Sequence, residues 1–242
     1  MKLMGFEAGN TLFKFCEERA FCEELASGRI YMKANGYFRQ LEDTYRGDPA
    51  DGRLKVEKTG KPLCVQLSSG KQLHMETVEE TVYGVDQDDQ LPVFCAVMFD
   101  GAIVEPPADG AVSTRFCSAF VQEMRQFGSY AVCVDLDEFL ESVQFHALER
   151  GYQCLHSKIH YFDTRSVFSQ IADAHEAMQC FPFAFFQKEL SYRWQNEWRC
   201  MLQSYGHAII PEGKDHYTLC AEPFESARIL KTEELLASEI ML

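Results

Sequence analysis

The residues best suited to chemistry lie in one C-terminal segment, Lys188-Glu-Leu-Ser-Tyr-Arg-Trp-Gln-Asn-Glu-Trp-Arg199. If the chain is extended from residue 195, strand alternation places Gln195, Glu197 and Arg199 on one face. A carboxylate this close to a guanidinium is expected to be ionised at neutral pH. Two interpretations follow. Either this polar trio emerges from a buried strand as a functional site, or the ion pair only satisfies a sheet edge or holds the loop at 35–52 in place.

A second group of candidates lies between residues 37 and 46, where Arg39 and Arg46 alternate with aromatic side chains. Guanidinium groups bind phosphate and aromatic rings stack on bases, so this composition suits a nucleotide. The alternative is a packed loop whose charges pair with one another. Asp48 and Asp51 lack the spacing and the final glutamate of a calcium loop, and the chain has no C-x2-C pair, so we expect no metal site.

The elements that position these residues are expected to form a single α+β domain over residues 1–242, with a mixed or mostly antiparallel sheet and helices packed against it. The almost wholly apolar run 91–99 predicts a central strand that is buried on both faces. A short strand interrupted by Lys14 and a helix at 17–27 precede it. The segment 35–52 is rich in charge and glycine, which indicates a long ordered loop.

The remaining periodic segments complete this expectation. Residues 54–99 favour a β-meander in which the turn Ser68-Ser69-Gly70 joins two strands of a hairpin, at 64–67 and 71–83. Amphipathic periodicity predicts helices at 114–127 and 137–150, each followed by a glycine. A strand is also predicted at 197–202, with its apolar side facing the core.

The composition excludes several classes of protein. The chain has 242 residues, of which 46% are hydrophobic and 13% aromatic, so it is not a disordered or low-complexity protein. Lys and Arg number 23 and Asp and Glu number 37, giving a net charge of −14, which disfavours a general coating of nucleic acid. The sequence has no apolar run of about 20 residues and no signal-peptide pattern, so we expect no membrane span. The ten cysteines are therefore interpreted as reduced, buried thiols of a cytoplasmic protein.

Residues 188–199 also fit the pattern Lys-x3-aromatic-x2-Glu/Gln-x-Glu-aromatic-Arg. This pattern resembles the C-terminal signature of a family of bacterial and phage domains of unknown function, in which glutamate is more common at the position of Gln195. The resemblance covers most of the chain and implies a bacterial or phage protein. Other short segments resemble that family in the same order: LFKF (12–15), GRIY (28–31), FRQLED (38–43), GDPADG (47–52), GSYAV (128–132), DEFL (137–140) and IHYFD (159–163).

The triplet Gln195-Asn196-Glu197 also resembles the start of the catalytic strand of ADP-ribosyltransferases, which begins with Gln-x-Glu or Glu-x-Glu. This resemblance implies an ADP-ribosyltransferase-like fold and NAD as the cofactor. It implies that Glu197 binds the nicotinamide-side ribose and stabilises an oxocarbenium-like transition state, while Gln195 orients the acceptor. Lys14 stands where that family's first motif has a central Arg or His, and it would contact phosphate without the planar guanidinium of an arginine.

Two hypotheses about function remain open at this point. The first is an ADP-ribosyltransferase-like enzyme that binds NAD or another nucleotide, and it predicts that the candidate residues converge in one concave site. The alternative is a non-enzymatic acidic protein of a defence or counter-defence system, or a nucleic-acid mimic, that binds a basic protein partner. It predicts that acidic residues gather on one face and that Gln195 and Glu197 are buried in structural pairs. For the enzyme, the catalytic residues are Glu197 and Gln195, and the ligand-binding residues are Lys14, Tyr31, Arg39, Arg46, Lys188, Tyr192 and Arg199.

Overall fold

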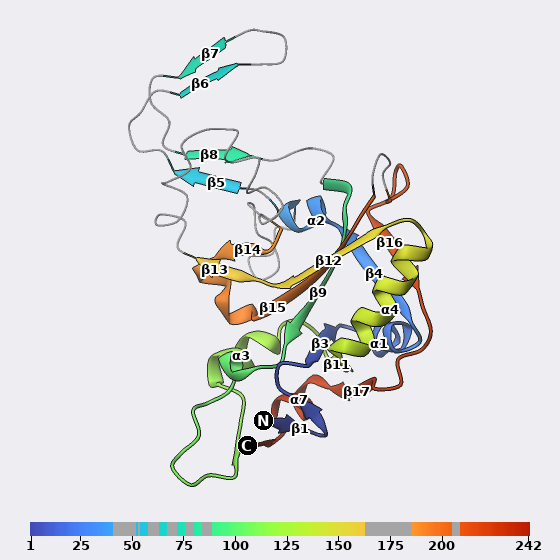
Figure 1. Cartoon of the computed structure of the whole chain (residues 1–242). Coiled ribbons are helices and arrows are strands. Elements are labelled where there is room, and N and C mark those ends of the chain that lie inside the picture. Colours follow the sequence, from blue (N-terminus) through green and yellow to red (C-terminus); the bar gives the residue numbers. More distant parts are fainter. Residues whose placement is uncertain are drawn as a thin grey trace.

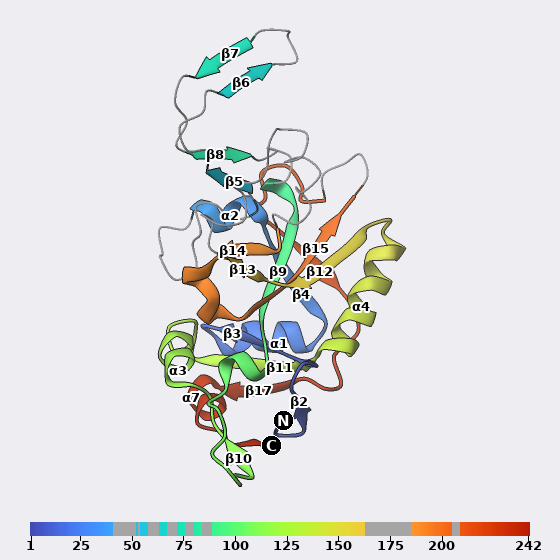
Figure 2. The same ribbon diagram turned by 60° about the vertical axis from the view of Figure 1, so that its left-hand side comes forward.

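The computed structural model describes residues 1–40, 52, 54–57, 63–66, 72–75, 80–83, 89–162, 185–204 and 209–242. In this part of the chain, eight strands form one antiparallel sheet (Figure 1, Figure 2). They are β3 Thr11–Cys16, β4 Arg29–Ala34, β9 Pro92–Met98, β11 Tyr130–Asp135, β12 Gln153–Lys158, β15 Glu197–Gln203, β16 His216–Cys220 and β17 Arg228–Lys231. Six follow the order β12-β15-β9-β3-β11-β17, while β4 pairs with β9 and β16 pairs with β4.

Shorter strands lie outside this sheet. The first and last strands of the chain are paired, so its two ends lie together in Figure 1. A four-stranded sheet contains β1 Lys2–Leu3, β2 Phe6–Glu7, β10 Ser113–Thr114 and β18 Ile240–Met241. The other pairs are parallel β13 His160–Phe162 with β14 Gln187–Glu189, antiparallel β5 Leu54–Glu57 with β8 Glu80–Tyr83, and antiparallel β6 Leu63–Gln66 with β7 Gln72–Met75.

The described helices are α1 Arg19–Ala26, α2 Asn35–Gln40, α3 Ser118–Met124, α4 Leu136–Glu149 and α7 Thr232–Leu236, with 3-10 helices η2 Gly101–Ile103 and η4 Leu190–Gln195. The longest, α4, begins directly after β11 because the Asp135 carboxylate caps it. This carboxylate accepts hydrogen bonds from the backbone N–H groups of Asp137 and Glu138 at 2.9 and 3.1 Å. Such a cap satisfies donors that a helix start leaves unpaired.

Two apolar cores lie on opposite faces of the sheet because strand residues alternate between faces. On one face, Phe139 of α4 packs against Phe94 of β9 and Trp198 of β15, with ring centroids 4.9 and 5.9 Å apart. On the other, Phe13 of β3 packs with Phe120 of α3 and with residues of α7. The sheet is therefore covered by α1 and α4 on one side and by α3 and α7 on the other.

The central strand β9 has an unusual set of partners. One edge pairs continuously with β15, from Val93 to Val97. The other edge is shared: β4 pairs with Pro92 and Val93, and β3 pairs with Val97 and Met98. Residues 94–96 lie between these two partners and pair with neither. We call this unpaired stretch of the β9 edge the sheet gap.

The sheet gap arises because the chain leaves β3, forms α1 and returns as β4 to the same edge of β9. The return depends on Gly28, which has a φ of +85° and follows α1 directly. A Cβ there would lie 2.4 Å from the carbonyl oxygens of Ala221 and Glu222. Only glycine combines this backbone conformation with so close an approach.

The expected α+β class with a mostly antiparallel sheet is confirmed, as are the central strand at 91–99 and the amphipathic helix at 137–150. The loop predicted at 35–52 is wrong for residues 35–40, which form α2. Phe38 packs against Val93 and Met201, and such tertiary contacts stabilise a short helix that local composition does not predict.

The predicted β-meander at 54–99 is also wrong in its connections. The segment 71–83 was expected to be one strand, but β7 pairs with β6 and β8 returns to β5. Local sequence does not determine which edge a strand selects. The hairpin pairing of β6 with β7 is as predicted, and its turn at residues 68–70 lies outside the described residues.

The described cysteines are free thiols. Cys16, Cys22, Cys133 and Cys200 are buried as predicted, whereas Cys220 is exposed, so the prediction of a core thiol is wrong there. None of the helices in the described ranges combines the length and the apolar character needed to cross a membrane.

A pair of phenylalanines on α4 tests the importance of the core. Phe139 is fully buried, whereas Phe145 is 58% exposed. We expect Phe139→Ala to lower the free energy of unfolding by about 3–5 kcal/mol, because it leaves a cavity among other rings. Phe145→Ala on the same helix is the matched control and should change it little. Urea unfolding measures both, and equal effects of the two variants would contradict this packing.

Candidate ligand-binding site

A pocket of about 900 Å³ opens at the sheet gap. Its floor is formed by β9, and β3, α1 and β4, the three elements that create the gap, form part of its walls. Lys188, Gln195 and Glu197 line it as well. The lining is mostly apolar and aromatic, and four cationic side chains reach it. The lining includes Phe13, Lys14, Glu17, Phe21, Glu24, Arg29, Tyr31, Lys33, Phe94, Cys95, Lys188, Gln195 and Glu197.

Lys14 occupies the centre of β3 and points to the sheet gap. Its ammonium group donates a hydrogen bond to the Cys95 carbonyl at 2.7 Å and lies 5.0 Å from the centroid of the Phe94 ring. In the described part of the chain no carboxylate forms an ion pair with it. An ammonium has three donors, so this lysine can accept a further anionic partner.

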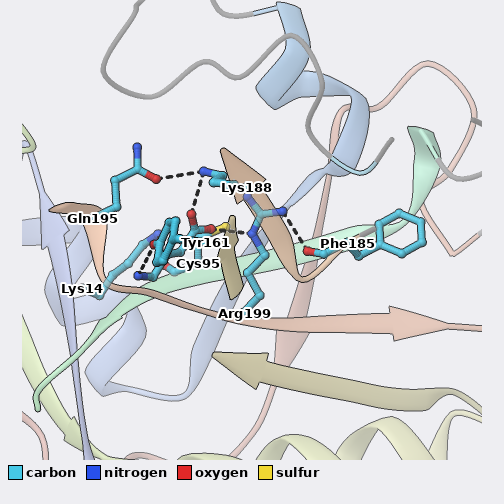
Figure 3. A network of polar contacts seen from close by, with 8 residues as sticks. Lys14, Cys95, Tyr161, Phe185, Lys188, Gln195 and Arg199 are labelled. Carbon is cyan, nitrogen blue, oxygen red and sulfur yellow. Dashed lines mark hydrogen bonds and ion pairs between the residues drawn. The ribbon is translucent and has the colours of Figure 1, made fainter. Parts of the chain in front are cut away.

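Glu197 lies at the start of β15, in a buried ion cluster drawn in Figure 3. One carboxylate oxygen lies 2.7 Å from Lys188 Nζ, and the other lies 2.5 Å from Arg199 Nε. The side chains of all three residues are at most 8% exposed. Both oxygens therefore have a cationic partner inside the protein.

The neighbours of this cluster hold the two cations in place. Lys188 Nζ also donates to the Gln195 side-chain oxygen at 2.9 Å, and Arg199 Nη1 donates to the Phe185 carbonyl at 3.0 Å. Figure 3 shows Lys188 and Arg199 approaching from different segments of the chain. The Tyr161 hydroxyl accepts a hydrogen bond from the Glu197 backbone N–H at 2.8 Å. Burial raises the pKa of Tyr161, so the phenol stays protonated.

The local backbone explains why β15 begins at Glu197. Asn196 has a left-handed φ of +41°, which ends η4 and redirects the chain into the strand. Its side-chain amide donates to the Met98 carbonyl at 2.6 Å and to Asp100 Oδ1 at 3.0 Å. Asparagine tolerates this conformation better than most residues, so it suits the position.

The electrostatics of Glu197 are dominated by its two partners. Burial alone would raise the pKa of the carboxyl group, but the charges of Arg199 and Lys188 outweigh burial and hold this pKa well below its usual range. The carboxylate is therefore ionised at all physiological pH values and is unsuited to act as a general acid. Two cations already compensate its charge, which weakens its ability to stabilise a further positive charge.

Five of the nine candidate residues line the pocket: Lys14, Tyr31, Lys188, Gln195 and Glu197. The others lie elsewhere. Arg199 is behind Glu197, Tyr192 has its ring centroid 5.5 Å from Lys188 Nζ, and Arg39 forms an ion pair with Asp89. Arg46 lies outside the described residues.

The expected polar face of the strand is corrected in one respect. Gln195 belongs to η4 rather than to β15, although its side chain still reaches the cluster through Lys188. Glu197 and Arg199 do not emerge from the sheet, because residues 197–202 are buried on both faces. The sequence reasoning missed Phe94 and the Cys95 carbonyl, since an apolar run signals a core strand and carries no sign of an unpaired edge.

Comparison of this chain with protein-family models, with curated proteins and with solved structures finds no match. The geometry of the pocket and of the ion cluster therefore has to support any functional conclusion.

Replacing the buried carboxylate should destabilise the fold. Glu197→Gln leaves Lys188 and Arg199 buried without a counter-charge, and we expect the free energy of unfolding to fall by about 3–5 kcal/mol. The matched control is Glu23→Gln, which removes one side of the exposed Arg19–Glu23 pair and should change it little. Urea unfolding followed by tryptophan fluorescence provides the measurement. A Glu197→Gln variant as stable as the wild type would contradict the ion cluster.

The same cluster predicts a pH dependence in acid. The folded-state pKa of Glu197 lies below 4.5, the ordinary value for glutamate, so the unfolded chain binds the proton more readily. The contribution of Glu197 to stability should thus be complete above about pH 4.5 and decline as the pH falls below it. The free energies of unfolding of the wild type and of Glu197→Gln, measured by urea unfolding at a series of pH values, should approach each other as the pH falls below about 4.5. A difference between them that does not change with pH would contradict the low pKa of Glu197.

Proposed function

We propose that the pocket at the sheet gap binds a nucleotide-type ligand, with NAD as the first compound to test. The observation that carries this proposal is Lys14, a cation without a carboxylate partner in the described residues, in a pocket otherwise rich in aromatic side chains. An ammonium group suits phosphate, and aromatic rings suit a base, so the two together fit a ligand that has both.

The aromatic part of the pocket supports stacking. The Tyr31 side chain is 46% exposed, and its ring stacks on His216 with a centroid distance of 4.7 Å. Phe21 of α1 is 56% exposed and also lines the pocket. Exposed rings at a pocket mouth are available to a planar ligand without rearrangement of the core.

The transfer of an ADP-ribosyl group, which the resemblance to ADP-ribosyltransferases implies, places a further demand on Glu197. Its carboxylate would have to face a sugar carbon that develops positive charge, yet both oxygens are engaged by cations. In this proposal, a ligand phosphate attracts Lys188 and so releases one carboxylate oxygen towards the sugar. Gln195 retains its proposed role beside the acceptor.

The alternative function also has one observation in its favour. A non-enzymatic acidic protein predicts that Glu197 and Gln195 are held in structural pairs, and both are bonded to Lys188. The net charge of −14 suits a basic protein partner. The pocket and Lys14 have no role in that alternative, so ligand binding distinguishes the two.

Calorimetric titration with NAD and NADP tests the proposal. We expect NAD to bind to the wild type and Lys14→Met to weaken its affinity by about tenfold or more, because one charge-assisted hydrogen bond is lost. Lys214→Met is the matched control, because Lys214 is exposed and does not line the pocket. It should leave the affinity unchanged.

Release of nicotinamide, followed by chromatography, tests the chemistry separately. The wild type should release it, and Glu197→Asp should not, because aspartate keeps the buried charge but withdraws the carboxylate by one carbon. If neither NAD nor NADP gives heat and no nicotinamide appears, the acidic-partner alternative becomes the better supported function.

A further inference from the structure

The backbone of β9 directs alternate peptide groups to opposite edges of the strand. The Met98 N–H donates to the Asn196 carbonyl on the β15 side, and the Phe99 N–H donates to the Thr11 carbonyl on the β3 side, both at 2.9 Å. Cys95 is four residues before Phe99, so its N–H and C=O point to the same edge as those of Phe99. That edge is the one shared by β3 and β4.

The pairing register leaves Cys95 without a strand partner at this edge. Val97 is opposite Phe13 of β3, and Val93 is opposite Lys33 of β4. Cys95 lies midway between them, at the centre of the sheet gap, and its carbonyl accepts its hydrogen bond from Lys14 instead of a strand. The same alternation directs its N–H to this edge, where Lys14 bonds the carbonyl of the same residue.

The charges around the pocket indicate which kind of group the Lys14 ammonium and the Cys95 N–H can bind. Arg29 pairs with Glu24, Lys33 with Asp215, and Lys188 with Glu197. Lys14 is the lining cation for which the described residues provide no such partner. An ammonium and a backbone N–H at the same strand position suit an anionic oxygen, since each supplies a hydrogen-bond donor.

We infer that the sheet gap is the anion subsite of the pocket, where an oxygen of a phosphate or carboxylate group accepts hydrogen bonds from Lys14 Nζ and the Cys95 N–H. This inference rests on the proposed function, because it names the part of the ligand that the gap holds. The Cys95 thiol does not oppose the anion. Burial, followed by the nearby charge of Glu197, raises the pKa of this thiol to about 12, so it is neutral.

The subsite also limits the charge of the ligand. The charged side chains that line the pocket, together with their ion-pair partners, carry a net charge of about +1. They are five cations (Lys14, Arg29, Lys33, Lys188 and Arg199) and four carboxylates (Glu17, Glu24, Glu197 and Asp215). This charge balances about one negative charge on a ligand, and the protein as a whole, at −14, repels more. NAD carries two phosphate charges and one pyridinium charge, so its net charge is a single negative one. NADP has an additional phosphate, whose charge this net charge of about +1 does not balance. Of the two, NAD should therefore bind more tightly.

The first test uses the ligand-free protein. Hydrogen exchange of backbone amides, followed by magnetic resonance on the full chain, should show the Cys95 amide exchanging at least about tenfold faster than those of Val93 and Val97, which are bonded to strands. Equal protection of the three amides would overturn the inference, because the Cys95 N–H would then already have an internal partner.

The second test titrates the same protein with inorganic phosphate, with acetate and with NAD. The Cys95 amide resonance should shift saturably, the Val97 amide should shift little, and Lys14→Met should weaken the apparent affinity about tenfold or more, whereas Lys214→Met should not. A shift with phosphate identifies a phosphate group as the ligand's anion, and a shift with acetate alone identifies a carboxylate. If none of the three compounds moves the Cys95 amide, the subsite is overturned.

These readouts separate the inference from the proposed function. Calorimetric binding of NAD with an unmoved Cys95 amide overturns the anion subsite and leaves nucleotide binding intact. A saturable shift of Cys95 by phosphate without any heat from NAD supports the subsite and overturns the nucleotide assignment. Tighter binding of NADP than of NAD overturns the charge limit.

Discussion

The buried carboxylate of Glu197 is the interaction on which the centre of the sheet depends. Two cations, Lys188 and Arg199, lie in the interior with almost no access to water, and each would be strongly unfavourable there without an opposite charge. Arg199 also donates a hydrogen bond to the Phe185 carbonyl, so it fixes the chain close to Lys188 as well as Glu197. The segment that brings Lys188 to the pocket is thus tied to β15 by charge as well as by packing.

The pocket has a different origin from the ion cluster, although the two share a wall. It exists because β3 and β4 approach the same edge of β9 and are kept apart by the residues between them. The tight turn at Gly28 brings the chain back to this edge, while β15 supports the opposite edge without interruption. Because one edge of β9 is paired continuously with β15 and the other is divided between β3 and β4, a pocket forms in the middle of an otherwise well-paired sheet.

Local sequence patterns predicted the elements better than their partners. The apolar run at 91–99 and the periodicity at 137–150 each reflect burial of a single element, so the strand and the helix could be predicted from their own residues. The sharing of one edge of β9 by two strands is a long-range choice, and no residue in β9 signals it. Arg39 illustrates the same point, because its partner Asp89 is 50 residues away.

The candidate site was predictable in part for similar reasons. Lys14 is conspicuous as a charge within an apolar strand, and Glu197 as a carboxylate close to a guanidinium. Their environments were not predictable, because Lys188 reaches Glu197 from a separate segment and the Cys95 carbonyl reaches Lys14 from another strand. The expectation of a polar face on β15 failed because burial of charge was offset by pairing, which a single segment does not reveal.

An open strand edge normally invites another chain to add itself and begin aggregation. The stretch of β9 left open between β3 and β4 is only three residues long, about 10 Å, which is too short to seat a strand from a second molecule. Lys14 lies at this stretch and donates a hydrogen bond to the Cys95 carbonyl. Charged side chains likewise protect the edge strands of natural sheets. The protein can therefore keep a short length of unpaired strand edge beside its pocket without exposing a template for self-association.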